Sequence, residues 1–220
     1  VVTIEATQEK LTLGGSALFP VFSIVDPTVI TSLPKRQLQN GVVDAFTHVM
    51  EQYLTYTHDA LLQDRISESI LQTLIEIGPD VVENPSDYKL ASNFVWSATM
   101  ALNGLIQKGV PSDWATHMIG HEITAFYGLD HAQSLAVVQP QLLRVMIADK
   151  QEKLTQMGKE VFGMPHNYEM VIEAIEFMYH SIGVPTNLND YNIDDKVVEN
   201  ITSALKKHGM TAIGENGTVT

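Results

Sequence analysis

The sequence contains no cysteine and only half as many basic as acidic residues. Without cysteine there can be no disulfide, thiolate-bound metal or cysteine nucleophile. Thirteen Lys and Arg against 26 Asp and Glu give a net charge of −13, which disfavours binding to the phosphate backbone of nucleic acids. No run reaches the ~20 apolar residues that span a bilayer, and no signal-peptide pattern opens the chain. We therefore expect a cytoplasmic protein with neither nucleic acid nor membrane as a partner.

The first 30 residues have the character of β-strands. β-Branched and aromatic residues predict strands at 1–4, 11–13 and 18–25, the last of them an edge or bulged strand because it contains Pro20. The chain also begins at Val1, without Met, inside an apolar run. A sheet of so few strands is only marginally stable by itself. We therefore expect this leader to belong to a sheet whose other strands lie outside the chain.

The rest of the sequence has helical periodicity. Helices are expected at 35–56, 62–77, 87–107, 113–126, 131–147, 150–161, 167–181 and 192–207. The pair Gly78-Pro79 is expected to end the second helix. The segment 87–107 is apolar nearly all round, which is typical of a central helix packed on several sides. The sequence thus predicts a mainly α-helical domain over 31–220, preceded by a β-rich leader over 1–30.

Two pairs of polar residues with helical spacing indicate a metal site. Asp44 and His48 are four residues apart, and so are His117 and His121, so that each pair lies on one helix face. His131 follows at the expected start of the next helix. Such pairs also occur on solvent-exposed helices. Here both lie in apolar helices, where unpartnered ionisable groups are costly, and imidazole with carboxylate is a ligand set suited to Zn²⁺ or Fe²⁺. Spacing alone does not separate ligands from non-ligands among the three later histidines.

Other candidate motifs do not extend this site. His121-Glu122 begins like the H-E-x-x-H motif of zinc proteases, but Ala125 stands where the second histidine is required. Four further histidines have no acidic or histidine partner at helical spacing, and we interpret them as solvent-facing or capping residues: His58, His166, His180 and His208.

Two segments resemble the metal-binding signatures of the iron-containing (group III) alcohol dehydrogenases. The first is Asn-Gly-Val-Val-Asp-Ala-Phe-Thr-His, which ends at His48, and the second runs over 113–133. Within that family the chain is most similar to the NADPH-dependent aldehyde reductases and butanol dehydrogenases. The resemblance implies the C-terminal helical metal-binding domain of the dehydroquinate synthase-like, iron-containing alcohol dehydrogenase fold. The β-rich leader would then be the end of an N-terminal Rossmann-like dinucleotide-binding domain that is missing from the chain.

The resemblance also implies roles for single residues. A divalent metal, Fe²⁺ or Zn²⁺, is expected on Asp44, His48, His117 and His131. His121 corresponds to a family histidine beside the nicotinamide and the substrate, and we expect it to act as a proton relay or orienting donor. Lys10 falls where the family has a lysine that contacts the cofactor.

The activity implied by the family is reversible hydride transfer between NADP(H) or NAD(H) and a small aldehyde or ketone, by an enzyme expected to be a homodimer. The metal would polarise the carbonyl oxygen of the substrate. We expect the chain to be inactive without the dinucleotide-binding domain. The alternatives are a non-catalytic helical metal-binding or interaction domain, and a glycerol dehydrogenase-like or dehydroquinate synthase-like member of the same superfold.

Overall fold

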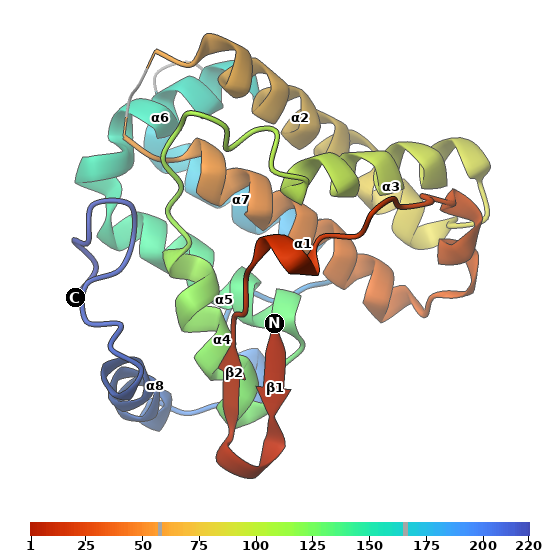
Figure 1. Ribbon diagram of the computed structural model, residues 1–220. Helices are drawn as coiled ribbons and strands as arrows, with labels where there is room; N and C mark the ends of the chain where they lie inside the picture. Colours follow the sequence, from red (N-terminus) through yellow and green to blue (C-terminus); the bar gives the residue numbers. More distant parts are fainter. Residues whose placement is uncertain (57–58, 165–166) are drawn as a thin grey trace.

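The computed structural model describes residues 1–56, 59–164 and 167–220, and over these ranges it is mainly helical (Figure 1). Its α-helices are α1 Lys35–Tyr53, α2 Leu61–Glu83, α3 Tyr88–Leu102, α4 Ala115–Tyr127, α5 His131–Val145, α6 Ile147–Glu160, α7 Tyr168–Ser181 and α8 Lys196–Lys207. A short hairpin of β1 Val2–Ile4 and β2 Glu9–Leu11 precedes them. Short 3₁₀ helices connect the elements at Glu5–Thr7, Ser16–Leu18, Pro27–Ser32 and Leu188–Tyr191. The prediction of a helical body after a β-containing leader is confirmed.

Helix α1 forms the centre of the main hydrophobic core. Twelve of its 19 residues are buried, and it packs against α2, α3 and α5. For 87–107 we predicted a central helix packed on several sides. Helix α3 does pack against α1, α2 and the 3₁₀ helix Pro27–Ser32, but only four of its 15 residues are buried, so the predicted central place is wrong. Helix α3 ends at Leu102, and Trp96 is 59% exposed and Leu102 is 51% exposed. Apolar residues around a helix do not specify its neighbours, and α3 covers one side of α1 with its small residues Ala91 and Ala101 buried.

Helix α2 continues through Gly78 and Pro79 to Glu83, so the predicted end of this helix at 78–79 is wrong. A Cβ at position 78 would lie 3.1 Å from Cγ1 of Val42 on α1, so the glycine allows the two helices to approach closely. Val81 and Val82, in the turn after the proline, are buried. Burial of this last turn outweighs the hydrogen bond that a proline removes from a helix.

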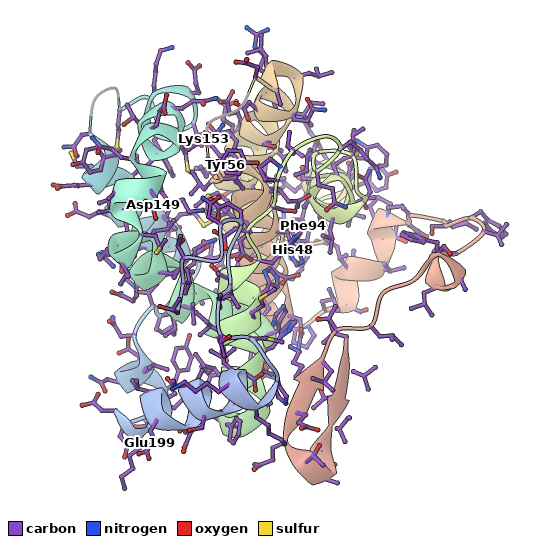
Figure 2. The ribbon with its side chains drawn as sticks, turned by 60° about the vertical axis from the view of Figure 1, so that its left-hand side comes forward. His48, Tyr56, Phe94, Asp149, Lys153 and Glu199 are labelled. Carbon is purple, nitrogen blue, oxygen red and sulfur yellow. The ribbon has the colours of Figure 1, made fainter. Side chains whose placement is uncertain are left out.

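The leader contains one antiparallel hairpin instead of three strands. Val2 pairs with Leu11 and Ile4 with Glu9, and β2 lies beside α4. The predicted strand over 18–25 is wrong: within the described ranges this segment pairs with no strand. Its side chains are exposed, Val21 and Ile24 most of all, and Figure 2 shows the segment between β2 and α1 projecting from the helices. An apolar run without a partner strand has no ladder of hydrogen bonds to fix it as β.

The end of α8 is tied to α4 and to the hairpin. Nδ1 of His208 lies 2.7 Å from Oε1 of Glu122 on α4, and Nε2 lies 3.2 Å from Oε1 of Glu9 on β2. The interpretation of His208 as a solvent-facing or capping residue holds for the cap, because His208 is the C-cap residue of α8. Its two acidic partners come from other elements. His180 is exposed, as expected, and contacts Thr186. His58 and His166 lie outside the described residues.

Two further expectations concern the whole chain. Within the three described ranges, no helix has the length and apolar character that a membrane crossing requires. The proposed domain boundary at residue 30 stays a prediction.

Candidate metal centre

Side chains from three helices meet beside the hairpin. Asp44 and His48 lie one turn apart on α1, His117 lies in the first turn of α4, and His131 is the first residue of α5. One ligand atom each from Asp44, His48 and His117 lies within 4.8 Å of the others. Oδ1 of Asp44 lies 3.4 Å from Nε2 of His131. Figure 2 shows His48 on the side of the helices that faces the N-terminal segment. Residues far apart in the sequence thus form one cluster.

The start of α5 fixes the position of His131. Asp130 caps this helix in a reciprocal capping box with Gln133. Nδ2 of Asn40, on α1, donates a hydrogen bond of 2.7 Å to Oδ2 of Asp130, and Arg36 lies 3.2 Å from the same oxygen. The cap therefore joins α5 to α1 next to the Asp44 carboxylate.

The donor atoms of this cluster fit a divalent metal. Nδ1 of His48 donates a hydrogen bond of 2.7 Å to the backbone carbonyl of Asp44, which leaves Nε2 with its lone pair. Among the described residues, no hydrogen-bond partner exists for three buried atoms, namely Nε2 of His117, Nδ1 of His131 and Oδ1 of Asp44. Buried polar atoms without a partner are rare in folded proteins. Three imidazoles and one carboxylate are the donor types that bind Zn²⁺ and Fe²⁺.

Glu51 belongs to this centre and was missed from the sequence. Its carboxylate is buried and accepts hydrogen bonds from the backbone N–H of Thr116, at 2.6 Å, and from Nδ1 of His117. The signal was present, because positions 44, 48 and 51 share one face of a helix. A glutamate at this spacing is normally solvated, and its burial depends on the start of α4, far along the chain.

A cavity of about 800 Å³ opens onto the cluster and is lined by all six residues singled out from the sequence. Besides the four candidate ligands, Lys10 of β2 and His121 of α4 line it. The ring of His121 lies 5.0 Å from that of His131. Trp114 also lines the cavity, with its ring 5.5 Å from that of His117 and a left-handed backbone (φ 65°) at the start of α4. The individual roles of these residues stay predictions.

Three histidines of the cavity, His48, His121 and His131, are held neutral. Burial lowers the pKa of His48, and burial together with the charge of Lys10 lowers the pKa of His121 to about 3 and that of His131 to about 2. Burial also lowers the pKa of Lys10, against the effect of Asp44. Neutral imidazoles keep the lone pairs that a metal ligand needs.

This burial makes a testable difference to stability. The pKa of His121 and of His131 is depressed in the folded protein, so below pH 6.5 only the unfolded chain takes up these protons. We expect the urea midpoint of the metal-free protein to fall from pH 7.5 to pH 5.5. His208 acts in the opposite sense, because Glu122 and then Glu9 raise its pKa. The His121→Gln/His131→Gln double variant removes the first effect and should show a flatter profile; an equally steep profile would contradict the assignment.

Close packing of α4 on α5 sets the distance between the histidines of the two helices. A Cβ at Gly120 would lie 3.0 Å from Cδ2 of Leu135 and 3.2 Å from Oγ of Ser134. Gly120→Val must push α4 away from α5, and we expect a loss of ~1–3 kcal/mol in the free energy of unfolding. Ala125→Val, in the same helix at a half-buried position, is the control. Urea denaturation measures the free energy of unfolding of both variants. If the two values are equal, α4 can move away from α5 without a loss of stability.

Comparisons with known proteins agree with this fold. Residues 39–216 match the model of the Fe-containing alcohol dehydrogenase family, C-terminal region. The NADPH-dependent aldehyde reductase YqhD of Escherichia coli is 44% identical over 225 residues, covering 100% of this chain and 58% of the relative. A probable NADH-dependent butanol dehydrogenase of Bacillus subtilis is 33% identical over 95% of this chain and 56% of the relative.

Solved structures give the same result. The crystal structure of E. coli YqhD has a TM-score of 0.98 and 43% identity, covering 100% of this chain and 57% of that one. The NADH-dependent butanol dehydrogenase A of Thermotoga maritima has a TM-score of 0.90 and 31% identity, covering 97% of this chain and 56% of that one. The chain thus spans less than three fifths of the length of these relatives. The match over 39–216 shows that the chain belongs to the Fe-containing alcohol dehydrogenase family and corresponds to its C-terminal region.

Proposed function

We propose that this chain is the metal-binding part of an alcohol dehydrogenase that transfers hydride reversibly between a nicotinamide cofactor and a small aldehyde or ketone. The observation that carries the proposal is the convergence of Asp44, His48 and His117 within 4.8 Å. It is supported by His131 beside Asp44 and by the unpartnered buried atoms described above. The relatives supply the cofactor class, since one is named as NADPH-dependent and another as NADH-dependent.

Each residue of the cavity has a part in this proposal. Asp44, His48, His117 and His131 would hold Fe²⁺ or Zn²⁺, which supplies Lewis acidity toward the carbonyl oxygen of the substrate. Leu102, Trp114 and Met118 give the cavity an apolar wall against which the carbon chain of a small aldehyde would pack.

His121 and Lys10 are assigned to the substrate and cofactor side of the cavity. His121 is neutral, and its Nε2, which has no hydrogen-bond partner among the residues that the structure describes, is free to exchange a proton with the alcohol oxygen. Lys10 adds a positive charge on β2, which suits a contact with the anionic cofactor.

Oxidation of NADPH or NADH by butyraldehyde, with added Fe²⁺ or Zn²⁺, tests the proposal. The assay is run on this chain and on the product of its complete open reading frame. We expect turnover from the complete product, dependent on metal and abolished by chelation. Chelation-sensitive metal binding without turnover of either protein would favour the alternative of a non-catalytic metal-binding domain.

A further inference from the structure

The Glu51 carboxylate lies where two helices and a metal-ligand candidate meet. It is only 5% exposed, and its two oxygens are used separately. Oε1 accepts the backbone N–H of Thr116 at 2.6 Å, while Oε2 accepts Nδ1–H of His117. The backbone carbonyl of Glu51 also accepts the N–H of Asp113 at 2.8 Å. One residue of α1 therefore fixes both the start of α4 and the ring of His117.

The contact with Glu51 determines which nitrogen of His117 carries the proton. A neutral imidazole has one N–H and one lone pair, and an ionised carboxylate can only accept a hydrogen bond. Nδ1 must therefore carry the proton, and the lone pair is placed on Nε2. That atom is buried and has no hydrogen-bond partner in the described part of the chain, in the cluster that His117 forms with Asp44 and His48. The hydrogen bond thus directs the lone pair into the metal cluster.

We propose that Glu51 is a positioning residue that holds His117 in the Nδ1–H tautomer required for metal binding. The proposal deepens the proposed function and rests on the metal site assigned there. His48 has an equivalent restraint, but its acceptor is the backbone carbonyl of Asp44, which substitution cannot remove. At His117 the restraint comes from a side chain, so it can be changed while the ligand itself is kept. In other proteins too, a hydrogen bond from the second ring nitrogen to a carboxylate or carbonyl orients metal-binding histidines.

Glu51→Gln is the informative substitution, because glutamine has the same shape but one acceptor and one donor group. Its oxygen can accept the N–H of Thr116, and its NH₂ then faces Nδ1 of His117. The favoured tautomer becomes Nε2–H, which points a proton at the metal position. If the amide is reversed, its NH₂ faces the N–H of Thr116, and two buried donors oppose each other. Glu51→Asp is the matched control, because it keeps two acceptor oxygens.

The test uses two measurements on the chain without metal and then with Zn²⁺. Two-bond ¹H–¹⁵N correlation spectra of histidine-labelled, metal-free protein at pH 8 report the tautomer of each ring. We expect Nδ1–H at His117 in the parent and in Glu51→Asp, and Nε2–H in Glu51→Gln. In a competition titration with a chelating dye, Glu51→Gln should bind Zn²⁺ roughly 10- to 100-fold more weakly than the parent, a loss typical of such outer contacts. Glu51→Asp should remain closer to the parent value.

Several results would overturn the proposal. One is a Glu51→Gln protein that keeps the Nδ1–H tautomer, whether or not it binds Zn²⁺ less well, since any loss would then be structural. Another is a switched tautomer with unchanged Zn²⁺ affinity. If Glu51→Gln does not fold, Glu51→Ala is measured in its place, and a folded Glu51→Ala protein that keeps the Nδ1–H tautomer would also contradict the proposal. A parent chain that binds no Zn²⁺ would contradict the proposed function, and the tautomer spectra would still decide the role of Glu51.

Discussion

Asp44→Asn and His131→Ala are each expected to abolish tight binding of a divalent metal by this chain. Asp44 is central to the cluster: its carboxylate lies 3.5 Å from Nδ1 of His48 and 3.4 Å from Nε2 of His131. Asparagine keeps the shape but loses the negative charge that offsets a dication. Loss of a hydrogen-bond partner of a metal-binding histidine weakens metal binding ~10- to 100-fold. Loss of a ligand itself should weaken metal binding further.

Elemental analysis after dialysis, with a Zn²⁺ titration, measures this effect. His121→Ala is the matched control, because His121 lines the same cavity on the same helix as His117 but is not assigned as a ligand. We expect this variant to retain stoichiometric metal, and the complete enzyme carrying it to show lower turnover with a changed pH profile. Stoichiometric metal in Asp44→Asn or His131→Ala would refute the assigned ligands. Loss of metal in His121→Ala would make His121 a ligand.

The second large effect is expected at Lys150, which is buried in α6 with 3% exposure. Its ammonium donates to the carbonyl of Leu54 at 2.7 Å, to Asp113 at 2.6 Å and to Glu215 at 2.5 Å. Burial raises the pKa of Glu215, and its hydrogen bond with Asp113 raises that pKa further. Lys150→Met leaves two carboxyl groups buried together without their cation. Breaking a buried ion pair in this way costs ~3–5 kcal/mol of the free energy of unfolding.

The pH dependence of the free energy of unfolding, together with a double variant, distinguishes loss of the buried cation from a general packing defect. A carboxyl group with a raised pKa takes up a proton as the pH falls, so the loss in Lys150→Met should be smaller at pH 5 than at pH 8. Lys150→Met/Glu215→Gln should recover part of the lost stability, which chemical denaturation measures. Lys159→Met, at an exposed pair with Glu160 on the same helix, should match the parent. Equal losses at both pH values, without recovery in the double variant, would refute a role for the buried charges.

Local sequence patterns predicted most helices and five of the six cavity residues, because those patterns need only one helix at a time. Lys10, on β2, was expected only from the resemblance to the family. The spacing of Asp44 and His48 places both on one face wherever α1 packs. Failures occurred where distant contacts decide the structure. Gly78 and Pro79 usually end a helix, but here α2 continues to Glu83, with Val81 and Val82 of its last turn buried.

Local sequence patterns were also insufficient to predict the whole candidate site. Glu51 has the correct spacing on α1, but it becomes part of the centre only because the N–H of Thr116 and the ring of His117 come to it from another helix. Likewise, His208 finds Glu122 and Glu9 on two other elements. The apolar run at 18–25 has strand composition, yet a strand forms only with a partner, which is a property of the assembled sheet.

The placement of the candidate ligands on α1, α4 and α5 has a consequence for the stability of the folded chain. Asp44 and His117 are far apart in the chain, so they meet only when the helices have docked. A metal held there would bind the docked helices and not the unfolded chain. It would therefore raise the free energy of unfolding as its concentration rises, so that the unfolding temperature depends on how much free metal surrounds the protein.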